Sequence, residues 1–245
     1  MSNHKWKLMD VHTHILPGVD DGAGSMEERL EMLRMAQKEG VVVIIATPHY
    51  GRYNPGYDPK QARETALQLR NQMKEHFPEM KLYMGNEIYY TPGVVEDVKS
   101  GRARTIGGSD YVLLEFSVRA GYKELYRAVQ DFTREGYRPI LAHIERYHCL
   151  QKEPERIREL KRIGAYMQVN ARGFLGGKRD RRAALCRSLL EEGLIDFIAS
   201  DCHDTELRSP VMCSAVERMV DFVGKAEVKR IVNTNILKLI RNEYI

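Results

Sequence analysis

The chain has 245 residues, of which 43% are hydrophobic and 29% charged, and its formal net charge is +4. These proportions are ordinary for a globular protein and exclude a disordered or fibrous chain. The charge excess is small and the densest basic run, at 172–182, contains a single aromatic residue, so we do not expect a nucleic-acid groove.

No apolar run approaches the roughly 18 residues of a membrane helix, and we therefore expect no membrane insertion. The first ten residues, MSNHKWKLMD, lack the apolar core of a signal peptide. We accordingly predict a cytoplasmic protein.

Short apolar runs alternate with amphipathic stretches along the chain. The runs are rich in β-branched or aliphatic residues, as buried parallel strands are, and lie at 8–11, 41–46, 82–84, 111–114, 139–142, 166–169 and 197–199. A helix is predicted after Ser25, which has the capping-box spacing to Glu28, and should end at Gly40. Further helices are predicted at 59–76, 121–135, 153–163, 180–192, 209–222 and 225–241.

Seven strand–helix repeats without a linker or a shift in composition predict one closed or nearly closed α/β barrel, so that 1–245 forms a single domain. An open doubly wound sheet is the alternative. It is disfavoured because no Gly-x-Gly-x-x-Gly motif follows the first predicted strand.

Histidines and acids follow the predicted strands where those strands end. These residues are His12, His14, His49, Glu87, Glu115, His143, Asp201 and His203. Asp21, in the loop after the first strand, can reach the same rim. The carboxyl ends of the strands of a parallel barrel share one face, where active sites are assembled. The sequence therefore predicts that these nine side chains converge.

Several carboxylates buried close together would be costly without positive charges beside them, because carboxylates repel one another and lose their hydration. Divalent cations remove both problems. Imidazole and carboxylate ligands without thiolate suit Mn, Fe or Zn. Nine ligands are too many for one ion and fit two or three, with a bridging carboxylate. Two such metals are the standard arrangement for in-line attack on phosphorus.

Two arginines extend this interpretation. Arg146 lies three residues after His143, and Arg208 lies seven after Asp201. Guanidinium groups match phosphate oxygens with paired hydrogen bonds, so both are candidate phosphate-binding catalytic residues.

A competing motif is Cys202-x5-Arg208, which has the spacing of thiolate phosphatases. The five intervening residues contain two acids and no glycine, which opposes a phosphate-binding backbone loop. Cys202 also alternates with Asp201 and His203 and should face away from them in an extended chain. The thiolate mechanism is therefore disfavoured.

The segments DVHTHILPGVDDG, ATPHY, GNEIYY, LLEFS, AHIERY, QVN and ASDCHD occur in order between positions 10 and 204. Together they resemble the bacterial tyrosine-protein phosphatases of the PHP (polymerase and histidinol phosphatase) superfamily, the CpsB/YwqE type. The resemblance implies the PHP fold, a distorted seven-stranded TIM-like (β/α)7 barrel, and a trinuclear site usually described with manganese. The sequence ELRSP departs slightly from the expected loop, which has a second proline after the arginine.

The resemblance also implies roles for the candidate residues. One metal would be held by His12, His14, Glu87 and Asp201, a second by Glu87, Glu115 and His143, and a third by Asp21, His49 and His203. Arg146 and Arg208 match phosphate-binding arginines. The implied substrate is phosphotyrosine on the C-terminal tail of a bacterial tyrosine autokinase that controls capsule or exopolysaccharide synthesis.

Other functions remain open at this point. A small-molecule phosphatase such as histidinol phosphatase could use the same site, and a nuclease or amidohydrolase is a further alternative. In a different class, the metals could hold a scaffold that only binds a kinase. Metal-restored hydrolysis of an aryl phosphate after chelation would exclude the scaffold.

Overall fold

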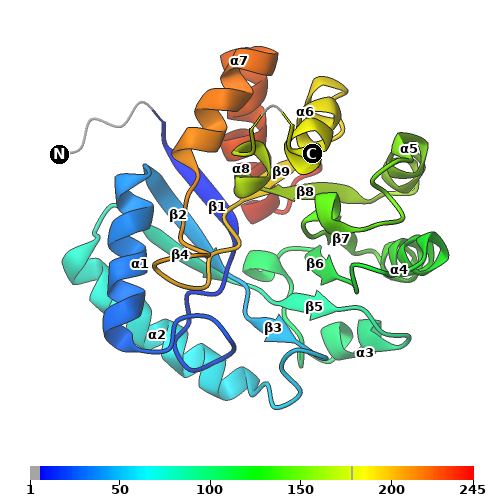
Figure 1. The fold of residues 1–245 in the computed structure, drawn as a ribbon. Coiled ribbons are helices and arrows are strands. Elements are labelled where there is room, and N and C mark those ends of the chain that lie inside the picture. Colours follow the sequence, from blue (N-terminus) through cyan, green and yellow to red (C-terminus); the bar gives the residue numbers. More distant parts are fainter. Residues whose placement is uncertain (1–5, 178) are drawn as a thin grey trace.

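Parallel strands form the centre of the molecule, and helices pack around their outside (Figure 1). The computed structural model describes residues 6–177 and 179–245, so Lys178 of the basic run lies outside the described residues. The strands are β1 Leu8–Thr13, β2 Val41–Ala46, β3 His49–Tyr50, β4 Lys81–Met84, β5 Glu87–Tyr89, β6 Tyr111–Glu115, β7 Arg138–Leu141, β8 Tyr166–Asn170 and β9 Phe197–Ala199. They form one sheet with the order β1-β2-β4 and another with the order β3-β5-β6-β7-β8-β9.

The two sheets curve into a half-barrel whose first and last strands meet. The segment after β9 runs parallel to β1, and Thr13 pairs with Cys202. The backbone N–H of His14 donates to the carbonyl of Cys202 at 2.9 Å, and that of Asp201 donates to the carbonyl of His12 at 3.0 Å. These bonds place the ends of β1 and β9 side by side, and with them the candidate ligands that they carry.

Every predicted apolar run forms a strand, and two short strands that were not predicted, β3 and β5, follow β2 and β4 after a break. Pairing stops at Ala46 and resumes at His49, because Pro48 in between has no N–H to donate. It stops again at Met84 and resumes at Glu87. Between them, a Cβ at Gly85 would lie 2.5 Å from the side chain of Ile106, so the chain is too close to its neighbour for a side chain there. His49 and Glu87 therefore begin strands β3 and β5, and they pair in register with each other.

The helices are α1 Met26–Lys38, α2 Pro59–His76, α3 Val94–Lys99, α4 Tyr122–Arg134, α5 Pro154–Arg162, α6 Arg181–Glu191, α7 Cys213–Lys229 and α8 Asn235–Ile240. Ser25 caps α1 by accepting a hydrogen bond from the N–H of Glu28, and Gly40 has a φ of +87° beyond its end. Both features confirm the predicted helix. The short helix α3 was not predicted.

The helix predicted at 209–222 begins later than expected, at Cys213. The preceding residues fold back instead: the N–H of His203 donates to the carbonyl of Arg208, and the N–H of Arg208 donates to the carboxylate of Asp204, at 2.8 and 2.9 Å. This loop returns Arg208 toward the ends of the strands.

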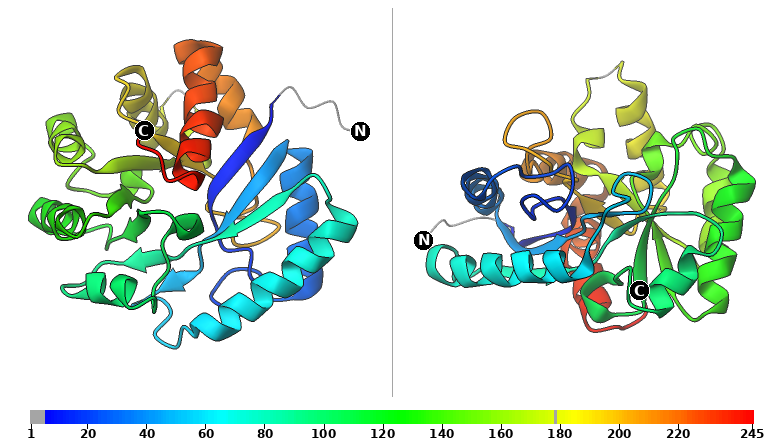
Figure 2. Two further views of the ribbon diagram at one scale, coloured as in Figure 1. Left: turned by 180° about the vertical axis from the view of Figure 1, so that it is seen from behind. Right: turned by 90° about the horizontal axis from the view of Figure 1, so that it is seen from below.

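Two buried layers hold the fold together. A smaller cluster that includes Val11, Ile45, Tyr111 and Phe197 lies on one side of the strands. A larger cluster fills the space between the strands and the helices, with α1 and α2 beside the β1-β2-β4 sheet and α4 beside β7 (Figure 2). None of the helices within 6–177 and 179–245 is long and apolar enough to cross a membrane.

Candidate metal centre

The predicted side chains converge at the carboxyl ends of the strands around a cavity of about 220 Å³. The residues that line it are Asp21, His49, Tyr53, Glu87, Glu115, His143, Arg146, Asp201 and Arg208. His12, His14 and His203 are buried beside them. The structure thus brings together all nine predicted ligands and both predicted arginines.

Glu87 lies at the centre of this cluster, in contact with four imidazole rings. Its Oε2 is 3.2 Å from Nε2 of His12 and 3.2 Å from Nε2 of His14. The same oxygen is 3.0 Å from Nδ1 of His49. Its Oε1 is 2.9 Å from Nε2 of His143. A buried carboxylate with ring nitrogens against both oxygens has the geometry of a bridging ligand.

A second group of side chains lies toward the mouth of the cavity. Oδ1 of Asp21 is 3.5 Å from Nε2 of His49 and also 3.5 Å from Nε2 of His203. The His203 ring stacks on the ring of His14 with 3.8 Å between centroids. The Asp21 side chain is 59% exposed, so this end of the site is open to solvent.

Three sets of ligand atoms in the cluster are close enough to hold an ion. They are His12, His14 and Glu87; His49, Glu87 and Glu115; and His14, Asp21, His49 and His203. The division differs in part from the one implied by the resemblance, because His49 contacts Glu115 as well as Asp21. Asp201 remains next to the first set, with its Oδ1 3.5 Å from Nε2 of His12.

Several buried polar atoms of the cluster have no hydrogen-bond partner. They are Oε2 of Glu115, Nδ1 of His143 and Nε2 of His203. An unsatisfied buried polar atom costs roughly 1–3 kcal/mol, which is unusual to find repeated within one site. Divalent cations would bind such atoms directly, and the imidazole and carboxylate donors suit them, so the residues fit a polynuclear metal centre.

The same residues shift one another's pKa values. Burial opposes protonation of His14, but Asp20 and Glu87 outweigh it and raise the pKa of His14 well above 6.5. Burial likewise opposes protonation of His143, whose pKa Glu115 and Glu87 nevertheless raise to about 10. Burial would raise the pKa of Glu87, yet the surrounding imidazoles hold it well below its usual range. In the metal-free site, protonated imidazoles thus offset the negative charge of the carboxylates, a role that bound cations would otherwise have.

Sequence reasoning missed Asp20, which supports two of the histidines. Its Oδ2 is 2.6 Å from Nδ1 of His14 and accepts a hydrogen bond from the N–H of His49 at 2.9 Å. The only signal was its position beside Asp21 in the predicted rim loop. Neighbouring residues of this turn point in different directions, and the sequence does not show which carboxylate faces inward.

Two further residues in the QVN segment also hold the ligands in place. Gln168 accepts a hydrogen bond from the N–H of His143 at 2.9 Å, and the same oxygen is 3.2 Å from Nδ1 of His12. Gln168 donates to Asn170, which in turn donates to Oδ2 of Asp201 at 2.8 Å. This chain links ligands from three strands and fixes their orientation.

The two arginines lie at the edge of the cavity. Nη2 of Arg208 donates to Oδ1 of Asp201 at 2.9 Å, and Nη1 of Arg146 is 3.7 Å from Oδ2 of the same carboxylate. Their side chains are 40% and 37% exposed. Each guanidinium therefore keeps N–H groups available for an anion entering from solvent.

Replacing Asp20 with asparagine should weaken metal binding and activity by about 10- to 100-fold, as loss of a charged partner of a ligating histidine does. Asparagine keeps the size of the side chain but removes the charge that orients His14. Metal titration of the variant measures the effect. If the variant bound metal as tightly as the wild-type protein does, Asp20 would not support the site.

Cys202 is not placed to act as a nucleophile. Its side chain is fully buried and does not line the cavity, and burial raises the pKa of its thiol. Cys202 points away from the cavity that Asp201 lines, as predicted, although the chain is not extended here, since Asp201 has a φ of +54°. The C-x5-R spacing is therefore a coincidence of the loop that returns Arg208.

Replacing Cys202 with serine should consequently leave most of the hydrolytic activity, since the hydroxyl is close in size to the thiol. The measurement is kcat on an aryl phosphate, with circular dichroism to confirm folding. An inactive but folded variant would instead support a thiolate mechanism with Cys202 as the nucleophile.

The fold and the site together define a class of protein: a parallel α/β half-barrel with a candidate polynuclear metal centre at the carboxyl ends of its strands. Residues 8–241 match the model of the CpsB/CapC family, described as capsular polysaccharide synthesis. The chain belongs to this family.

Curated relatives align along almost the whole chain. The tyrosine-protein phosphatase CpsB of Streptococcus pneumoniae is 31% identical over 243 residues, which are 97% of this chain and 100% of the relative. The tyrosine-protein phosphatase YwqE of Bacillus subtilis (strain 168) is 30% identical over 239 residues, which are 97% of this chain and 93% of the relative.

Solved structures agree with this assignment. A chain from the crystal structures of YwqE from Bacillus subtilis and CpsB from Streptococcus pneumoniae, described as unique metal-dependent tyrosine phosphatases, superposes with a TM-score of 0.89 at 30% identity, covering 97% of this chain and 96% of that one. A D-hydantoinase from Thermus sp. superposes with a TM-score of 0.60 at 11% identity, covering 95% of this chain and 70% of that one. The second similarity concerns the fold alone.

Proposed function

We propose that this protein is a metal-dependent protein-tyrosine phosphatase whose substrate is phosphotyrosine on a bacterial tyrosine autokinase that controls capsular or exopolysaccharide synthesis. The observation that carries the proposal is the buried carboxylate of Glu87 in contact with four imidazoles, at the carboxyl ends of the strands in a fold shared with metal-dependent tyrosine phosphatases. Family membership and the names of the relatives supply the substrate class.

The ligand assignment is part of this proposal. Two to three divalent ions would be held by His12, His14, Asp21, His49, Glu87, Glu115, His143, Asp201 and His203. We propose Mn²⁺, with Fe or Zn as alternatives, because the ligands are imidazoles and carboxylates without thiolates. We further propose that residues 1–245 form one domain and that the two sheets make up one distorted seven-stranded barrel, in which β2 with β3 and β4 with β5 are interrupted single strands.

The residues around the cavity suit hydrolysis of an aryl phosphate. When bound, such cations supply a water-derived nucleophile near neutral pH and offset charge on the phosphoryl oxygens. Arg146 and Arg208 bind and orient those oxygens with paired N–H groups, and they hold the charge that redistributes as the ester bond breaks. A tyrosyl leaving group has a pKa of about 10, so it needs less protonation than an alkyl alcohol. We therefore assign no general acid.

An aromatic side chain at the cavity fits an aromatic substrate. Tyr53 is 51% exposed, and its ring lies 5.4 Å from that of His49 and 5.3 Å from that of Tyr89. A phosphotyrosine ring entering toward the arginines can pack against Tyr53 in an offset or edge arrangement. Histidinol phosphate offers an imidazole but a longer alkyl link to its phosphate.

We place the protein in the cytoplasm, where ATP supplies the phosphate of its substrate.

The direct test compares two substrates on the purified protein, with and without added Mn²⁺. We expect kcat/KM for a phosphotyrosine peptide to exceed that for histidinol phosphate by more than about 10-fold, which corresponds to about 1.4 kcal/mol of transition-state discrimination. A preference of this size for histidinol phosphate would replace the proposed function with that of a small-molecule phosphatase.

A further inference from the structure

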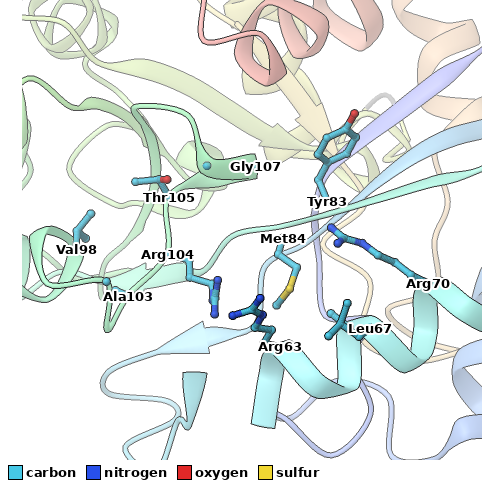
Figure 3. Close-up of a pocket in the computed structure, with 13 residues that line it drawn as sticks. Arg63, Leu67, Arg70, Tyr83, Met84, Val98, Ala103, Arg104, Thr105 and Gly107 are labelled. Atoms are coloured by element: carbon cyan, nitrogen blue, oxygen red, sulfur yellow. The ribbon is translucent and has the colours of Figure 1, made fainter. Parts of the chain in front are cut away.

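A second and larger cavity, of about 430 Å³, lies apart from the metal centre. It is an open pocket that lies between α2, β4 and the segment 101–108 (Figure 3). Here the β1-β2-β4 sheet ends at β4, and the next neighbour is the 3-10 helix Ile106–Gly108 instead of another strand. The two cavities share none of their lining residues.

The charge of this second cavity is positive. Arg63 and Arg70 project from α2, and Arg104 projects from the facing segment, with the ends of Arg63 and Arg104 turned toward one another (Figure 3). None of the described residues that line the cavity is acidic. Guanidinium groups that converge without a carboxylate repel one another, and an anion between them removes that repulsion.

The donors of these arginines are only partly used by the protein. The side chain of Arg63 makes no hydrogen bond or ion pair within the described part of the chain. Nη2 of Arg104 donates to the carbonyl of Pro59 at 3.3 Å, while its Nε is buried without a hydrogen-bond partner. Arg70 is fixed by two donations to the carbonyl of Leu82, at 3.1 and 3.2 Å. The cavity thus combines two guanidiniums that donate to backbone carbonyls with that of Arg63, whose donors are unused.

Several apolar side chains also line the cavity. Leu67 is 48% exposed, and the cavity is also lined by Ala66, Met84 and Val98. A volume of about 430 Å³ falls within the roughly 300–1,000 Å³ of small-molecule sites. The site therefore offers charged donors for an anion and an apolar surface for the group attached to it.

We propose that this cavity is a second binding site that takes a small phosphate ester with an apolar portion. The phosphate accepts hydrogen bonds from Arg63 and Arg104, and the apolar portion lies against Leu67 and Met84. Arg70 adds charge while it stays bonded to Leu82. We assign the site no chemistry, because its described lining residues include no histidine, cysteine or acidic side chain.

Isothermal titration of the metal-loaded protein with benzylphosphonate tests the proposal, since this probe has a phenyl ring, a doubly charged head group and no hydrolysable ester. We expect two sites per chain. Arg63→Ala should weaken one of them by about 10-fold, as loss of a charge-assisted hydrogen bond does, and should leave the other unchanged. Arg208→Ala should weaken only the other site.

The matched control is Lys60→Ala, which removes one positive charge from the same helix outside the cavity and should leave both affinities unchanged.

Inorganic phosphate should bind the Arg63-dependent site about 10-fold more weakly than benzylphosphonate, because it cannot bury a phenyl ring. Arg63→Ala should retain wild-type hydrolysis of an aryl phosphate. A single class of sites that responds to Arg208→Ala but not to Arg63→Ala would overturn the proposal, and so would equal effects of Lys60→Ala and Arg63→Ala.

Discussion

Replacing Glu87 with glutamine should lower kcat/KM on a phosphotyrosine peptide by at least about 1,000-fold. The amide has the same shape but no charge, and it cannot place an anionic oxygen against both His14 and His143. Losing an outer-shell partner of a metal ligand costs about 10- to 100-fold, and losing one preorganised electrostatic contact to the transition state costs about 100- to 1,000-fold. A ligand shared by two metals should cost more than either. Single-turnover hydrolysis measures the change.

Glu145→Gln is the control for this variant. Glu145 is also a buried glutamate close to the cluster, and burial raises its pKa, but it does not line the cavity. The same chemical change there should leave most of the activity. Comparable losses in both variants would show that Glu87 matters only for folding, and the bridging role assigned to it would be wrong.

Removal of the metals with excess chelator should abolish hydrolysis and lower the melting temperature while the protein stays folded. Ions bound at about 100 times their Kd stabilise the folded state by about 2.7 kcal/mol per site. In a chain of this length, that corresponds to roughly 5–10 °C for one site. Calorimetry and activity should both recover when Mn²⁺ is restored in excess.

The difference between the chelated and metal-loaded melting temperatures should depend on pH. In the metal-free protein, Asp20 and Glu87 raise the pKa of His14 above 6.5, and Glu115 and Glu87 raise that of His143 to about 10, against the effect of burial. Raised pKa values contribute stability that is complete below about pH 6.5 and is lost as the pH rises toward 10. Cations must also displace those protons, so metal affinity increases over the same range. The difference should therefore be larger at about pH 9 than at about pH 6.

A difference that narrows from pH 6 to pH 9 would contradict this account of proton and metal competition. Activity that survives complete chelation would contradict the metal requirement itself. The Cys202→Ser variant, measured in parallel, separates the second outcome from a thiolate mechanism.

Much of the fold was predictable because buried parallel strands are continuous apolar runs. Each predicted run forms a strand, and the Ser25 and Gly40 signals locate α1. The interruptions at Pro48 and Gly85 were not predicted. The first is visible in the sequence as a proline beside a strand end, but the second depends on Ile106, which is distant in sequence and contacts Gly85 only in the folded chain.

The convergence of the candidate ligands was also predictable, since parallel strands all end on the same face of the barrel. What could not be predicted was the local direction of each side chain. Asp20 faces His14 while the neighbouring Asp21 lies at the mouth of the cavity, and nothing in the doublet separates them. Gln168 lies within the predicted strand at 166–169, where a polar residue buried against His12 is recognisable only once its partner is known.

The central claim is that bound cations compensate the carboxylates gathered around Glu87. Elemental analysis of the purified protein, with the metal content divided by the protein concentration, tests it most directly. We predict two to three divalent ions per chain in the wild-type protein and a clear deficit in Glu87→Gln. Only trace metal in wild-type protein that still hydrolyses phosphotyrosine would contradict the account.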